Sequence, residues 1–97
     1  MKTIEEIREI IKSKKQYLKE KYEVKELGIF GSYVRDEQTG LSDIDILVEF
    51  EKSPGFVKFI KLENYLNELL DIRVDLVTRK ALKPHMANKI LQELQNV

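Results

Sequence analysis

The chain has 97 residues, of which 42% are hydrophobic and 35% are charged, and its 17 Lys and Arg residues balance its 17 Asp and Glu residues. This length predicts a single domain, residues 1–97, and a net charge of zero excludes the broadly basic surface of a general nucleic-acid-binding protein. With no cysteine, no membrane-length apolar run and no signal-peptide core, we expect a cytoplasmic protein without disulfides or thiolate metal sites.

The first predicted element is an amphipathic helix over residues 3–22. Thr3 followed by Glu6 is a capping box, and apolar residues then recur mostly on one helical face. The opposite face carries Lys and Glu, and we interpret its lysines as solvated rather than phosphate-binding.

A short apolar strand over residues 26–30 is predicted to end in a tight turn at Gly31 and Ser32. We expect Ser32 to cap a helical turn over residues 33–37, with free N–H groups that suit a phosphate. Taken alone, Gly31-Ser32 is more typical of an ordinary strand-to-helix turn, since Gly and Ser occur in turns of every kind.

Two acids open the next predicted strand, which runs to Phe50. Asp43 and Asp45 are two residues apart, so their side chains share a face, about 6–7 Å apart at Cα. Carboxylates this close repel one another unless one is protonated or a divalent cation lies between them, and an oxygen-only ligand set favours magnesium or manganese.

A predicted helix over residues 56–70 leads to a further strand, in which Asp75 is the only acid among apolar residues. Strand, helix and strand in this order predict a parallel pairing, which would place Asp75 beside Asp43 and Asp45. Three carboxylates have the charge to hold two magnesium ions for an in-line displacement at phosphorus.

The last predicted element is a helix over residues 81–95 that packs on the same core, with Pro84 near its start. We expect His85 to be exposed, and we interpret the basic cluster of Arg79, Lys80 and Lys83 mainly as solvated surface.

The combined motif resembles the polymerase-beta-type nucleotidyltransferase superfamily, and the short length resembles its minimal nucleotidyltransferase branch. The matching residues are Gly31-Ser32, ten intervening residues, Asp43-x-Asp45, and the later Asp75. The resemblance covers roughly residues 26–91 and implies an α/β (α+β) fold: a small mixed sheet flanked by helices, the nucleotidyltransferase palm. Two positions depart from the pattern of the branch: Val34 stands where Ala is common, and Asp36 replaces the usual Gly and adds a negative charge to the turn.

This resemblance also implies a reaction, the magnesium-dependent transfer of AMP from ATP to a hydroxyl group. Gly31 and Ser32 would hold the β and γ phosphates, Asp43 and Asp45 would ligate both metal ions, and Asp75 would ligate the catalytic ion and help to deprotonate the acceptor. Arg35 either contacts a phosphate or pairs with Glu37 or Asp36.

Members of this branch act as antitoxins that transfer AMP to a tyrosine of a HEPN-type toxin ribonuclease, and this chain resembles such an antitoxin. One alternative is a binding module that neutralises a protein partner by contact alone. Another is a transferase for a small molecule such as an aminoglycoside, but those enzymes have a second domain, which 97 residues do not accommodate.

Overall fold

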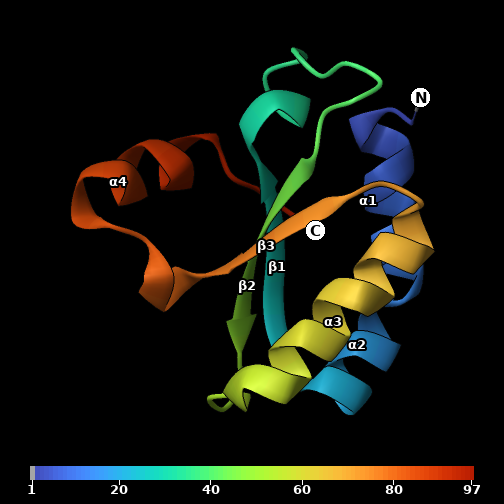
Figure 1. Cartoon of the computed structure of the whole chain (residues 1–97), viewed down its shortest axis with the longest axis vertical. Coiled ribbons are helices and arrows are strands. Elements are labelled where there is room, and N and C mark those ends of the chain that lie inside the picture. Colours follow the sequence, from blue (N-terminus) through green and yellow to red (C-terminus); the bar gives the residue numbers. More distant parts are fainter. Residues whose placement is uncertain (1) are drawn as a thin grey trace.

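The computed structural model describes residues 2–97, which form one mixed sheet with helices on both of its faces (Figure 1). The helices are α1 (Ile4–Ser13), α2 (Lys15–Tyr22), α3 (Gly55–Leu70) and α4 (Pro84–Glu93), and the strands are β1 (Val24–Phe30), β2 (Ile44–Phe50), β3 (Val74–Thr78) and β4 (Gln95–Asn96). None of the helices in this part of the chain is long and apolar enough to cross a membrane.

The strand order is β3-β2-β1-β4, so the two strands that carry the acids are neighbours. β2 and β3 run parallel, as the strand-helix-strand order predicts, and β1 runs antiparallel to both β2 and β4. The predicted α+β fold with a small mixed sheet is confirmed.

Strand alternation divides the sheet into a covered face and an open one. Ile44, Ile46 and Val48 of β2 are fully buried against the layer formed by α1, α2 and α3. Burial of such aliphatic side chains contributes about 1.5–3 kcal/mol each, so this face accounts for most of the packing energy. Asp45 and Asp75 occupy intervening positions of their strands and therefore lie on the opposite face.

The first helix differs from its prediction because it breaks at Lys14, which has φ −110° and ψ 8°. The predicted capping box between Thr3 and Glu6 is present. Residues 12–17 are all exposed, and the Ser13 hydroxyl donates to the Ile10 carbonyl at 2.6 Å. A side-chain bond of this kind competes with the helix, which restarts at Lys15.

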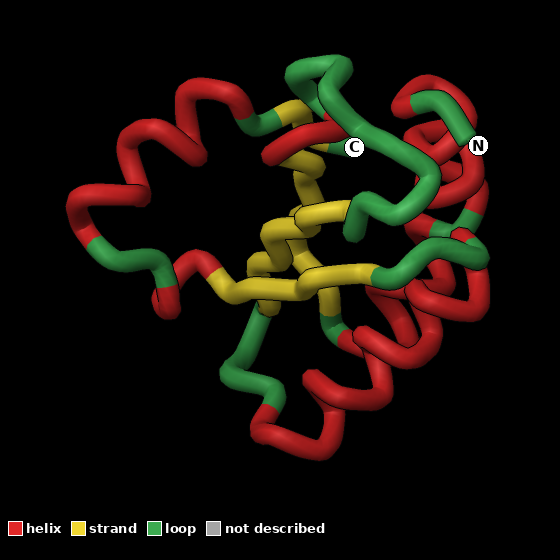
Figure 2. Tube along the Cα trace, turned by 45° about the horizontal axis from the view of Figure 1, so that its top comes forward, coloured by secondary structure: helices red, strands yellow, loops and turns green. Residues whose placement is uncertain are grey.

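The prediction for the last helix was wrong in its bounds and in its packing. Pro84 holds Lys83 in an extended conformation, with φ −69° and ψ 141°, so α4 begins at Pro84. It ends at Glu93, and the next residues form β4. Figures 1 and 2 show α4 across the sheet from the other helices, so it does not join their core. Ile90 is the buried residue of this helix.

Candidate active site

The turn after β1 requires glycine for two reasons. Gly31 has φ +81°, a conformation that L side chains rarely adopt. A Cβ atom at this position would also overlap the Asp45 carboxylate, whose Cγ would lie 3.0 Å away. Gly31 therefore allows the end of β1 to approach the acid of β2.

The helical turn beyond Gly31 differs from its prediction. It is a single 3-10 turn over Gly31–Tyr33 rather than a turn over residues 33–37, and Phe30 occupies the N-cap position without a side-chain bond. Ser32 lies inside this turn, so it cannot be the cap; its carbonyl accepts from the Glu37 N–H at 2.9 Å. The Ser32 hydroxyl makes no hydrogen bond within residues 2–97.

Asp36 takes a left-handed conformation with φ +58°. Such a backbone favours glycine, and Asp is among the few other residues that tolerate it. The turn therefore keeps a shape suited to Gly, although Asp stands in its place.

Three residues form a row across the open face of the sheet at its Asp-bearing end. Phe30 pairs with Asp45 across the antiparallel strands, and Asp45 pairs with Asp75 across the parallel strands. Asp45 is half-buried, whereas Asp75 and Asp43 are exposed. The sequence predicted one cluster of Asp43, Asp45 and Asp75. The strand pairing brings Asp45 and Asp75 together, whereas Asp43 comes before β2 begins and is not part of this row.

Negative charge accumulates at Asp45. Burial, followed by the charges of Asp75 and Asp43, raises the pKa of the Asp45 carboxyl to about 6, and the charge of Arg35 opposes this rise. A carboxylate destabilised by its acidic neighbours gains from a nearby cation. The surplus of carboxylate oxygens thus fits a divalent cation such as magnesium.

The acids do not form a ready-made metal cage. Within residues 2–97, no group of three or more His, Cys, Asp or Glu side chains is arranged to hold a metal ion. Asp45 and Asp75 line one cleft, and Asp43 lines a separate hollow together with Tyr33 and Arg73.

The cleft that contains Asp45 and Asp75 has a volume of about 550 Å³ and lies between the open face of the sheet and α4. Phe30, Gly31 and Arg35 line it on the sheet side. The helix side of the cleft is lined by Lys83, which the sequence interpretation had placed on the solvated surface, and by His85, Met86, Lys89, Ile90 and Glu93. His85 is exposed, as predicted, and lines this cleft.

Arg35 pairs with two acids. Its Nε donates to Glu37 at 2.7 Å, as one of the sequence alternatives anticipated, and its Nη1 donates to both carboxylate oxygens of Glu93 at 3.1 Å. Hydrogen bonds with Glu37 and then Glu93 raise the pKa of the Arg35 guanidinium. Glu93 also accepts from the Gly31 N–H at 2.9 Å.

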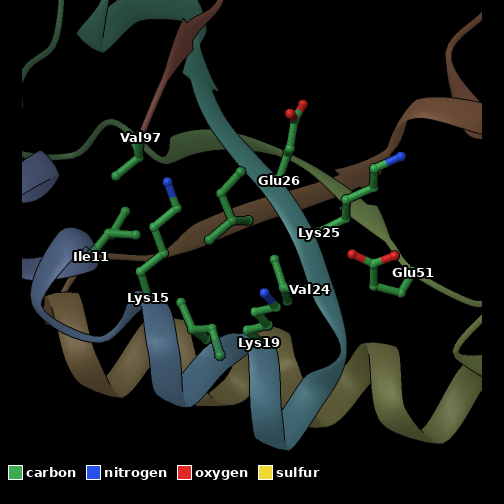
Figure 3. A pocket seen from close by; sticks show the side chains of 10 residues that line it. Ile11, Lys15, Lys19, Val24, Lys25, Glu26, Glu51 and Val97 are labelled. Carbon is green, nitrogen blue, oxygen red and sulfur yellow. The ribbon is translucent and has the colours of Figure 1, made fainter.

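A further hollow, between α2 and β1, has a volume of about 150 Å³ and is smaller than the cleft against α4 (Figure 3). Lys15, Lys19 and Lys25 line it together with Glu26 and Glu51. Its charges are mixed, and neither Asp45 nor Asp75 lines it, so the cleft against α4 is the better candidate site.

Parallel strands that place two carboxylates side by side, next to a Gly-Ser turn, define a nucleotidyltransferase palm. The family model described as "Nucleotidyltransferase domain" matches residues 4–97, and the chain belongs to this family.

Curated relatives match nearly the whole chain. Protein adenylyltransferase MntA of Thermococcus cleftensis is 50% identical over 94 residues, which cover 97% of this chain and 95% of the relative. A protein of Methanocaldococcus jannaschii, MJ0128, is provisionally named a protein adenylyltransferase. It is 55% identical over 93 residues, which cover 96% of this chain and 95% of the relative.

Solved structures share the fold. A provisionally assigned minimal nucleotidyltransferase superposes with a TM-score of 0.83 at 28% identity, covering 99% of this chain and 97% of that one. A toxin-antitoxin complex with AMP-PNP gives a TM-score of 0.71 at 24% identity, covering 87% of this chain and 69% of that one. At that identity the second match supports the fold alone.

Proposed function

We propose that this nucleotidyltransferase is a protein adenylyltransferase that moves AMP from ATP to a tyrosine hydroxyl of a HEPN-type toxin, and so acts as its antitoxin. The observation that carries the proposal is the pairing of Asp45 with Asp75 beside the Gly31 turn, in an open cleft. The names of the relatives support the acceptor class, because those at 50% identity and above are called protein adenylyltransferases. A tri-AMPylated HEPN toxin of Shewanella oneidensis is part of one complex that shares the fold, at 21% identity.

The residues have separate roles in this proposal. Gly31, Ser32 and Arg35 bind the triphosphate. Asp43, Asp45 and Asp75 would hold magnesium, two ions in our proposal, which would offset the negative charge of the triphosphate and of the transition state. Asp45 is the half-buried anchor of this set, while Asp75 remains exposed to an incoming acceptor.

The reaction joins the tyrosine oxygen of the acceptor to the α-phosphorus of ATP. The bond between that phosphorus and the oxygen bridging to the β-phosphate breaks, and pyrophosphate leaves with the electron pair. The tyrosine proton passes to the Asp75 carboxylate. Positioning and charge stabilisation account for most catalysis of this kind, which suits a domain that offers a cleft and few reactive groups.

The acceptor has to contribute to its own placement. Residues 2–97, the part of the chain that the structure describes, form one sheet and its helices and include no second lobe that could orient an acceptor beside the cleft. A protein that docks through its own surface supplies that orientation. We therefore expect the chain alone to turn over little ATP.

Labelled ATP tests the proposal. The chain is mixed with a HEPN-type toxin, magnesium and ATP labelled at either the α or the γ phosphate. Label from the α position should become attached to the toxin, and label from the γ position should leave as pyrophosphate. Attachment of γ label would indicate phosphorylation, and a toxin silenced without any label would favour a binding module.

A further inference from the structure

Glu93, at the end of α4, holds the groups that the proposed function assigns to the nucleotide phosphates. Its carboxylate accepts from the Gly31 N–H at 2.9 Å and from Arg35 Nη1 at 3.1 Å to each oxygen. The Glu93 side chain is only 18% exposed, against 62% for Glu37, the other partner of Arg35. Glu93 is therefore a mostly enclosed anion at the Gly31 turn.

We propose that Glu93 is an internal competitor of the nucleotide: its carboxylate occupies the phosphate-binding groups in the free protein, and the triphosphate displaces it. This inference rests on the proposed function. Carboxylates and phosphates are both anionic acceptors that take charge-assisted bonds from the same backbone and guanidinium donors. Gly31 has one N–H to donate, and two anions at one turn repel each other, so the carboxylate and a phosphate exclude each other.

The displacement is a rotation of the Glu93 side chain, because the backbone that follows is fixed. Leu94 packs against Gly28, where an added Cβ would lie 2.6 Å from its Cδ1. β4 pairs with β1, and the Val97 N–H donates to the Leu27 carbonyl at 2.9 Å. α4 therefore stays in place while the carboxylate leaves.

Lys89 offers the released carboxylate a new partner. It lies one helical turn before Glu93 and lines the same cleft. Residues four apart on a helix are neighbours, so the two side chains can pair once Arg35 has turned to the phosphates. After this exchange Glu93 pairs with Lys89 and Arg35 pairs with the phosphates, so neither charge is left without a partner.

Glu37 provides a matched control. It pairs with the same Arg35 and carries the same charge, but it does not bind the Gly31 N–H. Loss of the Glu37 charge therefore alters the surroundings of Arg35 without freeing the backbone donor.

Calorimetry with magnesium and ATP tests the inference on the full chain and its Glu93→Gln, Glu93→Ala and Glu37→Gln variants. If Glu93 occupies the site in roughly 70–90% of free molecules, its replacement should lower the Kd for ATP by about three- to tenfold, because a partly closed site weakens apparent affinity in proportion. Glu37→Gln should change the Kd less. Inorganic triphosphate should show the same gain, and adenosine should show none.

A second measurement uses the unmodified chain. The carboxyl carbon resonance of Glu93 should shift as inorganic triphosphate saturates the site, because its hydrogen-bond partners change. An unmoved resonance at saturation would overturn the inference.

Other outcomes separate this inference from the proposed function. Unchanged or weaker ATP binding in both Glu93 variants overturns the competition and makes Glu93 a positioning residue for Arg35, while nucleotide transfer stands. Failure of the unmodified chain and all variants to bind ATP overturns the proposed function and this inference together.

Discussion

Asp45 of β2 and Asp75 of β3 are direct partners in a parallel pair of strands, and both lie on the face that α1, α2 and α3 leave open. Because the pairing comes from strand register, the acids stay together in the free protein. Their mutual repulsion is a cost that the fold carries until a cation or a proton offsets it.

The first prediction concerns pH and the stability of the metal-free protein. The pKa of Asp45 is raised from its ordinary value of 3.8 to about 6, so the folded state binds this proton more tightly than the unfolded state does. The resulting stabilisation is complete below the unfolded pKa and disappears as the pH rises through about 6. In EDTA, the free energy of unfolding measured with urea should therefore decrease between pH 5 and pH 7.5 because of this carboxyl group.

The variant Asp45→Asn tests whether the Asp45 charge causes this pH dependence of stability. The amide removes the repelled charge, so at pH 7.5 the metal-free variant should be more stable by about 1–2 kcal/mol, a value reduced for the partial exposure of Asp45. The free energy of unfolding of the variant should also depend less on pH, because the Asn side chain does not titrate. A variant less stable than the parent at pH 7.5 would show that the Asp45 charge is already compensated.

The second prediction concerns Gly31. Gly31→Ala places a side chain at φ +81° and against the Asp45 carboxylate. We expect a loss of about 1–2 kcal/mol from backbone strain alone, and a loss of ATP binding as Asp45 shifts.

Gly40→Ala is the control for this substitution, because its added Cβ would have no atom within 4 Å. It should leave thermal unfolding and ATP affinity nearly unchanged. Equal effects of the two substitutions would refute a special role for Gly31.

The third prediction concerns Asp36, whose φ is +58°. Asp36→Gly should change the free energy of unfolding by less than about 1 kcal/mol, because relief of strain is offset by the greater freedom of glycine in the unfolded chain. Asp36→Val should destabilise by about 1–2 kcal/mol, because a β-branched residue resists this conformation. Similar stability of the two variants, measured by urea unfolding, would argue that the turn rearranges.

The fourth prediction concerns metal removal. The acidic cluster repels a triphosphate until a cation binds, so calorimetry with ATP should show weak binding in EDTA and at least about tenfold tighter binding with magnesium, or about 1.4 kcal/mol. Equal affinity in the two conditions would be incompatible with the proposed metal site.

Local pattern was sufficient to predict the acids of the sheet. The alternation from Ile44 to Val48 places Asp45 opposite the core, and the intervening helix makes β3 parallel, which brings in Asp75. The assignment of metal and phosphate contacts to these residues stays a prediction.

The sequence patterns could not predict contacts between residues that are far apart in the chain. Glu93 lies 62 residues from the Gly31 N–H that it accepts from, and nothing in its own helix distinguishes it from a solvated acid. β4 has two residues, too few to show a period, and the chain ends there in pairing with β1 rather than in more helix. The break at Lys14 is likewise invisible to periodicity, because Ile11 and Leu18 are seven residues apart and fit one continuous helix.

The intact mass of a HEPN-type toxin, recorded before and after incubation with this chain, ATP and magnesium, tests the central claim most directly. We predict added AMP units on a toxin tyrosine with the unmodified chain and none with the variant carrying Asp43→Asn, Asp45→Asn and Asp75→Asn. A toxin that is silenced equally by both chains, with no change of mass, would contradict the account.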